Sequence, residues 1–267
     1  TSRGFPVFLL SDGIHADGSS AAVKMNKTLV CPVAYNEHVK LQGVIERFLK
    51  SPVYGRVDYL IVDDGSTDGT TEMIRSFRDR GVGTVKHPFR MGVGSAIRTA
   101  IKYAVENKYQ VVVIMAGNDK DNPDEIPRLI DPILKDGCDI VQGSRYVNGN
   151  RTGGDMPLYR KLATRLHPFL FSLAARRRVT DSTNGFRAIR LSIFEDQRIN
   201  LDQEWLNAYE LEPYILFKAI RLGYRFAEAP VTKIYPSKKL GYTKMRPIFG
   251  WWSILKPIFY LGLGIKK

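Results

Sequence analysis

The sequence predicts an α/β protein with a mostly parallel sheet flanked by helices on both faces. From Lys27 to Tyr146, β-rich apolar runs alternate with segments of helical spacing, and the links between them are short. The chain has 267 residues, of which 44% are hydrophobic and 25% charged. That length and composition are ordinary for a globular protein with a sizeable core.

The period of the apolar residues divides the chain into elements. We expect strands at 27–34, 57–62, 109–115 and 138–146, and a short strand or loop at 83–89. We expect helices at 38–51, 70–81, 91–107 and 123–137. After residue 158 the alternation gives way to a long amphipathic stretch at 158–178, and 205–235 has the pattern of a helix followed by a strand.

Three parts are expected: a leader or disordered extension at 1–26, one domain at 27–235, and a basic aromatic tail at 236–267. No stretch reaches the roughly 20 apolar residues of a membrane-spanning helix. Cys31 and Cys138 lie far apart without a partner at metal-binding or disulfide spacing. They suit a reducing compartment and predict neither a disulfide framework nor a zinc site.

The net charge of +13 is concentrated in two stretches of the second half. Residues 158–190 carry +7 and residues 231–267 carry +8, which leaves about −2 for the rest of the chain. A regional excess of this kind indicates a binding site or surface for anions rather than general solubility.

Polar loops follow the first two strands, at PVAYNE (32–37) and IVDDGSTDGT (61–70). Such loops lie side by side at the carboxyl edge of a parallel sheet, where ligands bind. Asp63 or Asp64 can accept from a nucleobase N–H or a ribose hydroxyl, and we favour a site role for Asp64. Asp68 is better explained as a cap of the next helix.

A glycine-opened helix follows at FRMGVGSAIR (89–98). Gly92 lets the backbone approach a ligand, and a helix N-terminus favours phosphate. Arg90 and Arg98 can bring positive charge to a diphosphate, although a surface position is the commoner fate of an arginine such as Arg98.

Five motifs, taken in their order along the chain, resemble the inverting GT-A glycosyltransferases of family 2. They are PVAYNE, IVDDGSTDGT, GVGSAIR, VVVIM with its acidic loop, and VTDSTNGFRAIR. The closest resemblance is to the dolichyl-phosphate mannose synthase-like branch, and it covers about residues 27–235. It implies a GT-A (Rossmann-like) fold, a nucleotide-diphospho-sugar donor, and a divalent cation, Mg²⁺ or Mn²⁺. Donor-binding positions implied in this way are Pro32, Tyr35, Glu37, Asp63, Asp64, Arg90, Gly92, Arg98 and Asn118.

The family's Asp-x-Asp metal motif is altered in this chain, which has MAGNDKDNPDEIP at 115–127. Aligned without gaps, the two usual acids fall on Ala116 and Asn118. Asp119 and Asp121 repeat the spacing three residues on, so we expect Asn118, Asp119 and Asp121 as metal ligands, since magnesium needs few carboxylates. The alternative is a loop in which Asp121 or Asn122 caps the helix starting at Pro123.

Two further motifs match acceptor-binding segments of the lipid-phosphate branch, QGSRY (142–146) and STNGFRAIR (182–190). The second is expected as a loop just before a helix. Arginine suits phosphate because its planar fork donates two hydrogen bonds at once, whereas the alternative is a surface salt bridge. The expected acceptor-binding residues are Ser144, Arg145, Ser182, Thr183 and Arg187.

YELEP (209–213) matches a segment whose acid lies near the donor sugar. A hydroxyl acceptor would need Glu210 or Glu212 as a general base. A phosphate acceptor is already an anion and needs none, and either acid alone can serve in a salt bridge. The expected catalytic set is therefore Asp121, Arg145, Glu210 and Glu212.

The tail mixes aromatic residues such as Trp251 and Trp252 with lysine and arginine, and it has no acid. This favours an amphipathic segment on anionic lipid; packing on the domain or an oligomer contact is the alternative. No nucleic-acid recognition motif is present. We expect a peripheral enzyme at the cytoplasmic membrane face that moves a sugar to a polyprenyl phosphate. The rivals are transfer to a hydroxyl of a lipid-linked glycan or polysaccharide, and a non-catalytic nucleotide-sugar-binding protein.

Overall fold

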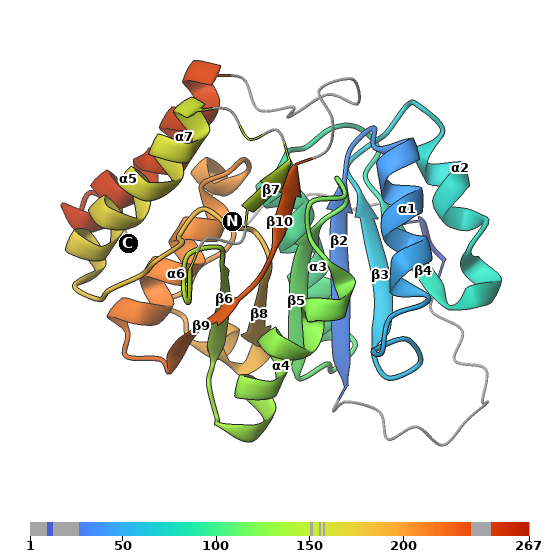
Figure 1. Cartoon of the computed structure of the whole chain (residues 1–267), viewed down its shortest axis with the longest axis horizontal. Helices are drawn as coiled ribbons and strands as arrows, with labels where there is room; N and C mark the ends of the chain where they lie inside the picture. Colours follow the sequence, from blue (N-terminus) through green and yellow to red (C-terminus); the bar gives the residue numbers. More distant parts are fainter. Residues whose placement is uncertain are drawn as a thin grey trace, which may run out of the picture.

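An eight-stranded mixed sheet forms the centre of the computed structural model, which describes residues 10–12, 27–149, 152–154, 156, 158–235 and 247–266 (Figure 1). In spatial order its strands are β1 (Leu10–Asp12), β4 (Val82–Lys86), β3 (Asp58–Asp63), β2 (Thr28–Ala34), β5 (Val111–Ala116), β8 (Arg187–Arg190), β6 (Ile140–Ser144) and β9 (Phe226–Pro230). β1 and β8 pair antiparallel with their neighbours, and the other pairings are parallel. The expected mostly parallel sheet is confirmed.

Helices cover both faces of this sheet, as the sequence predicts. One face packs against α1 (His38–Phe48), α2 (Thr70–Arg75) and α4 (Ile126–Lys135), and the other against α3 (Val93–Glu106), α5 (Leu158–Ala175), α6 (Leu211–Arg221) and α7 (Pro247–Gly262). Alternating strand residues divide between the two cores: Leu29 and Cys31 join the α3 side, and Val30 joins the α1 side. Both faces are therefore buried, which explains why the strands appear as continuous apolar runs.

Short elements complete the described part of the chain. Within it, four 3₁₀ helices lie at Arg78–Arg80, Pro123–Glu125, Leu191–Glu195 and Glu204–Leu206. A separate two-stranded parallel sheet joins β7 (Thr152–Gly154) to β10 (Lys233–Tyr235). Asn122 caps the 3₁₀ turn at Pro123 by accepting a hydrogen bond from the Asp124 N–H at 3.1 Å, as the cap alternative for this loop predicted.

The parallel register brings the polar loops together at one edge of the sheet. Ala34 pairs with Asp63, and Pro32 with Met115, so β2, β3 and β5 end side by side. The segments after these strands, which carry Tyr35, Asp64 and Asn118, therefore share the carboxyl edge where open α/β sheets bind ligands.

The segment around Arg187 differs from its predicted form. Arg187 does not lie in a loop before a helix; it begins strand β8, which lies between β5 and β6 and runs antiparallel to both. Only a five-residue 3₁₀ helix follows. Ala188 and Ile189 of this short strand are fully buried, and its sheet partners come from far upstream in the chain.

The described part of the tail forms α7, which packs against α5 and α6 (Figure 1). Lys256 pairs with Glu210 at 2.8 Å, and the Ser253 hydroxyl accepts a hydrogen bond from the Tyr209 N–H at 3.0 Å. Helix α7 therefore packs on the domain, which was the alternative expectation for the tail. Among the described residues, no helix is both long and apolar enough to cross a membrane. Most of the extension at 1–26 and residues 236–246 lie outside the described part.

Candidate active site

A pocket of about 310 Å³ opens at the carboxyl edge of the sheet. It runs from the loops after β2 and β3, past the end of β5, to α5 and α7. Its charged lining consists of Arg90, Lys120, Arg145, Arg160 and Lys233 on the basic side and Glu37, Asp64 and Glu212 on the acidic side. The balance among these described residues is positive, which suits an anionic ligand.

The end of the pocket beside β2 and β3 contains five of the residues predicted to bind the donor. Tyr35, Glu37, Asp64, Arg90 and Gly92 all line it. The Arg90 guanidinium lies 4.5 Å from the centre of the Tyr35 ring, a cation–π contact, and Glu37 pairs with Lys40 at 3.1 Å. Pro32 is buried within β2 and is not part of the lining.

The adjacent acids Asp63 and Asp64 make different contacts. Asp63 is fully buried and accepts hydrogen bonds from the Ser66 N–H, at 2.9 Å, and the Thr71 hydroxyl, so it organises the turn rather than reaching the pocket. Asp64 borders the pocket, yet its oxygens accept from the N–H groups of Met91 at 2.8 Å and Gly92 at 2.9 Å. It also contacts the His87 Nδ1 at 2.8 Å.

The first turn of α3 packs closely against the segment around Asn207, while Gly92 and Val93 also line the pocket. Gly92 has φ +101°, and a Cβ there would lie 2.3 Å from the Asn207 carbonyl oxygen, so glycine is needed for this close approach. The Ser95 N–H donates to the same carbonyl at 3.2 Å. Arg98 donates to the Leu201 carbonyl at 2.7 Å and the Asn207 side chain at 2.9 Å. The structure therefore gives Arg98 a structural role, and it does not line the pocket.

The acids expected to hold a metal do not converge in the pocket. Asp121 is 2% exposed; its Oδ1 pairs with the Lys233 ammonium at 2.7 Å, and its Oδ2 accepts from the Ala116 N–H at 3.0 Å. Asp119, whose φ is +64°, pairs with Arg47. Of the three expected ligands only Asn118 lines the pocket, and its Oδ1 is buried without a hydrogen-bond partner. The described residues contain no group of three acids, histidines or cysteines suited to a metal ion.

A divalent cation therefore does not fit the residues of this loop. Hard cations in proteins take oxygen ligands and usually at least one carboxylate. Here Asn118 offers the pocket one neutral amide oxygen, and the carboxylates of Asp119 and Asp121 already contact cationic side chains.

Basic side chains that the sequence analysis did not single out gather around Tyr235 instead. The Lys120 ammonium lies 5.4 Å, and the Arg160 guanidinium 5.9 Å, from the centre of its ring. Lys233 lies nearby, because β10 forms a bridge with Asp121. Burial, together with the positive charges of Lys233 and Arg160, lowers the pKa of Lys120 to about 7. The available signal was the lysine inside MAGNDKDNPDEIP; the other partners come from distant segments.

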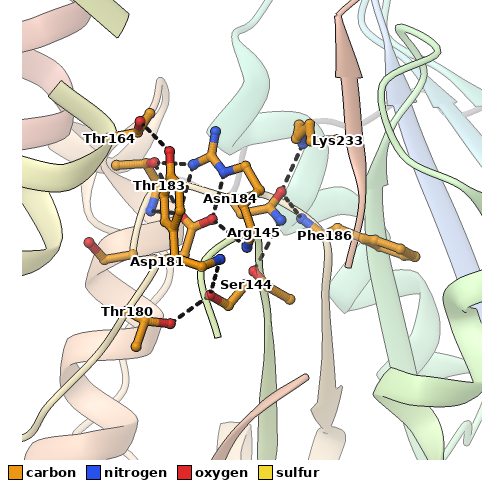
Figure 2. Close-up of polar contacts among 12 residues, drawn as sticks. Ser144, Arg145, Thr164, Thr180, Asp181, Thr183, Asn184, Phe186 and Lys233 are labelled. Carbon is orange, nitrogen blue, oxygen red and sulfur yellow. Dashed lines mark hydrogen bonds and ion pairs between the residues drawn. The ribbon is translucent and has the colours of Figure 1, made fainter. Parts of the chain in front are cut away.

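Arg145 is held in a network at the end of the pocket beside α5 and α7 (Figure 2). Asp181 accepts from its Nε at 2.6 Å and its Nη2 at 2.7 Å, Thr183 accepts at 2.6 Å, and the Tyr235 hydroxyl accepts from Nη1 at 3.0 Å. Burial alone would lower the pKa of Arg145, but the ion pair with Asp181 outweighs burial and raises it. Of the five N–H groups of the guanidinium, these contacts leave at most one for a ligand.

The other expected acceptor residues divide between the pocket and its support. Thr183 lines the pocket. Ser144 is fully buried and contacts the Thr180 hydroxyl at 2.6 Å, and Ser182 contacts His167 Nδ1 at 2.7 Å. Arg187 is 1% exposed and donates to the carbonyls of Glu212 and Asn184, each at 2.8 Å. The structure thus does not bring Ser144, Ser182 or Arg187 to the pocket.

Of the two candidate bases, one lines the pocket and the other does not. Glu212 lines the pocket and lies 3.5 Å from the Arg187 guanidinium. Glu210 is 4% exposed and holds Lys256 of α7, away from the pocket lining. If the reaction needed a carboxylate base, Glu212 is the one that the fold places for it.

Comparisons with known proteins identify the family of the chain. The profile of Glycosyl transferase family 2 matches residues 30–198. An undecaprenyl-phosphate mannosyltransferase of Micrococcus luteus is 30% identical over 70% of this chain and 75% of its own length. A polyprenol monophosphomannose synthase of Mycolicibacterium smegmatis is 30% identical over 82% of this chain and 81% of its own.

The fold also matches a solved structure, glucosyl-3-phosphoglycerate synthase of Mycobacterium tuberculosis. The match has a TM-score of 0.65 at 19% identity and covers 91% of this chain and 81% of that one. That synthase was crystallised with Mn²⁺, UDP-glucose and phosphoglyceric acid, and also with Mg²⁺ and UDP. At this level of identity the likeness shows a shared fold, which confirms the GT-A expectation.

Proposed function

Because the chain belongs to glycosyl transferase family 2 and is a glycosyltransferase, we propose that it moves a sugar from a UDP- or GDP-sugar to a polyprenyl phosphate. The resemblance to the lipid-phosphate branch is confirmed by the two relatives of that kind. The observation that carries the proposal is the continuous basic pocket, which joins the donor end at Tyr35 and Arg90 to helices α5 and α7.

The nucleotide-sugar would occupy the donor end. Asp64 holds the loop of Met91 and Gly92 in place, and Arg90 remains over the Tyr35 ring as one wall of the pocket. Lys120 and Lys233 line the pocket beyond these residues. They would hold the diphosphate, so that the sugar points toward the acceptor end.

The acceptor phosphate would lie near Arg160 and Thr183, with Arg145 behind them. Arg145 orients Thr183 and Tyr235 and leaves one N–H for the phosphate. Ala163 and Thr164 of α5 and Ile254 of α7 line the same end, so a lipid chain leaves the pocket between these helices.

The reaction then needs positioning and charge rather than a base. An acceptor phosphate oxygen attacks the anomeric carbon as the bond from that carbon to the β-phosphate oxygen breaks, so configuration inverts and the nucleoside diphosphate leaves. The nucleophile is already an anion near pH 7, so no proton has to be removed. Held cations stabilise the charge that develops on the leaving group.

The outer faces of α5 and α7 support contact with the membrane. Exposed apolar side chains follow one face of α5, namely Leu158, Leu162, Leu166, Phe169 and Leu173. Helix α7 adds Trp252 and Phe259, and Leu263 follows its last residue. Lys161, Arg165 and Arg176–Arg178 are exposed beside them. Apolar side chains flanked by basic ones fit an anionic lipid surface, which we place at the cytoplasmic face, where nucleotide-sugars are available.

A panel of donors and acceptors tests the proposal. Purified protein receives UDP- and GDP-sugars, with and without Mn²⁺, and a short-chain polyprenyl phosphate, the matching polyprenol, or an oligosaccharide. Mass spectrometry is expected to find one added sugar on the polyprenyl phosphate alone. Product on the oligosaccharide but not on the lipid phosphate would establish the hydroxyl-acceptor rival, with Glu212 as its base.

A matched pair of variants tests whether the acceptor phosphate binds in the pocket. Arg160→Gln removes a lining charge, and Arg165→Gln removes an exposed one from the same helix. With the detergent-soluble acceptor, Arg160→Gln should raise KM for the lipid phosphate at least tenfold, and Arg165→Gln should change it less than twofold. Equal effects would mean that Arg160 acts only through general charge.

A further inference from the structure

We propose that side-chain cations, with Lys120 foremost, hold the donor diphosphate in this protein in place of a divalent metal ion. The proposal rests on the proposed function, because it concerns the same donor. It identifies Lys120, supported by Lys233 and Arg160, as the group that neutralises the leaving nucleoside diphosphate.

The first evidence is the position of the acids. Asp121 has a side chain that is 0% exposed, and its two oxygens contact the Lys233 ammonium and the Ala116 N–H. Asp119 contacts Arg47 of α1. Turning either acid into the pocket would leave a buried lysine or an arginine without its carboxylate partner, which is costly at the buried Lys233 site.

The second evidence is Lys120, which lines the pocket where the two acids do not. Lys120 lies between the two acids in sequence, is 6% exposed, and lines the pocket at the end of β5. Its position is fixed by the neighbouring backbone, because the Ile234 N–H donates to the Lys120 carbonyl at 3.1 Å and ties the loop to β10. A lysine side chain is therefore built into the strand end at which the donor diphosphate is expected.

The third evidence is the charge of the surroundings. Lys233 and Arg160 line the pocket together with Lys120, and the Lys120 ammonium and the Arg160 guanidinium both lie against the Tyr235 ring. Because Lys233 is already paired with Asp121, the uncompensated positive charge here comes from Lys120 and Arg160, which repel a metal dication and attract a diphosphate. Asn118 adds a side-chain amide that can donate to a phosphate oxygen.

This arrangement supplies what the leaving group needs. As the anomeric carbon–oxygen bond breaks, its electron pair goes to the β-phosphate oxygen, and an ammonium held beside that oxygen stabilises the new charge. No proton transfer or additional reactant is required.

Nucleotide binding without metal tests the inference. The full chain is treated with EDTA, and UDP, GDP and the matching monophosphates are titrated calorimetrically with EDTA present and then with excess Mn²⁺. We expect one diphosphate to bind in EDTA with an affinity within threefold of that in Mn²⁺. Lys120→Met should weaken diphosphate binding at least tenfold and monophosphate binding less than threefold.

The controls separate the possible failures. Lys135→Met removes an exposed lysine of α4 and should leave binding unchanged, and circular dichroism confirms that each variant is folded. Binding that appears only with Mn²⁺, or Lys120→Met binding like the wild type, overturns this inference and leaves the proposed function standing. If neither nucleotide binds under any condition, the proposed function fails and this inference fails with it.

Discussion

The Lys233 ammonium lies 2.7 Å from Asp121 Oδ1 and 2.8 Å from the Asn184 side-chain oxygen, so strand β10 is bound to the loops after β5 and before β8. This ion pair is nearly buried, with side-chain exposures of 11% for Lys233 and 0% for Asp121. Asp121, which the sequence predicts as a metal ligand, is therefore a structural partner of Lys233, a lysine that lines the pocket.

Asp121→Asn should therefore act mainly on stability. Removing one partner of a buried ion pair costs about 3 kcal/mol, which corresponds to a melting temperature lower by roughly 10 °C for a domain of this size. Calorimetric melting checks the value. Asp131→Asn, which breaks an exposed pair on α4, should shift the melting temperature by less than about 2 °C. A fully stable Asp121→Asn protein that has lost all nucleotide binding would point to a ligand role instead.

Asn118→Asp should make nucleotide binding respond to metal. Asn118 is the one expected ligand that lines the pocket, and an acid there adds a negative charge beside the diphosphate. In EDTA the variant should bind UDP or GDP at least tenfold more weakly than the wild type, and Mn²⁺ should recover most of the loss. Titration calorimetry measures both, with the exposed Asn107→Asp as control. A variant whose binding is the same with and without Mn²⁺ would contradict this reading of the loop.

His167 makes the attachment of α7 sensitive to pH. Its Nε2 contacts the Ile254 carbonyl at 3.0 Å and its Nδ1 the Ser182 hydroxyl at 2.7 Å. Burial lowers the pKa of His167, and the Ile254 contact and Asp181 only partly oppose this. The unfolded chain, with a histidine pKa of about 6.5, takes up a proton that the folded chain resists.

The sign follows from that difference in proton binding. The stability contributed by neutral His167 is complete above the unfolded pKa and is lost as the pH falls below it. Urea unfolding at pH 7.5 and pH 5.5 should therefore show a larger loss for the wild type than for His167→Gln, which cannot titrate. If both proteins lose the same amount, His167 does not carry this dependence.

The apolar faces of α5 and α7 should bind anionic vesicles. Leu162 and Leu166 are 66% and 59% exposed, and burying a leucine contributes about 2 kcal/mol. Leu162→Ser with Leu166→Ser should reduce vesicle binding at least tenfold in a flotation assay, and high salt should weaken the wild type. Val39→Ser, at a 70% exposed position on α1, is the matched control. Unchanged flotation of the double variant would remove α5 from the membrane contact.

The sheet could be predicted because its parallel strands are buried on both faces and leave long apolar runs. Strand β8 could not, because its place between β5 and β6 depends on partners about 45 and 75 residues upstream. The same limit applies to the site. Arg145 and Arg187 both stand at motif positions, but only the folded chain shows that Arg145 borders the pocket while Arg187 is bound to backbone carbonyls.

Long-range pairing also explains what the sequence analysis missed in the metal loop. Asp119 and Asp121 have the spacing of ligands, and nothing local indicates that Arg47 and Lys233, from distant segments, would neutralise them. Tyr235 lies at the end of the predicted domain, yet it contacts Lys120, Arg145 and Arg160 at once.

A crystal structure grown with UDP or GDP and excess Mn²⁺, with data collected at the manganese absorption edge, tests the role of the cations most directly. We predict that the β-phosphate lies within hydrogen-bond distance of the Lys120 ammonium and that no anomalous peak lies between the two phosphates. A manganese peak that bridges both phosphates and the Asn118 side chain would contradict this and restore the metal to the reaction.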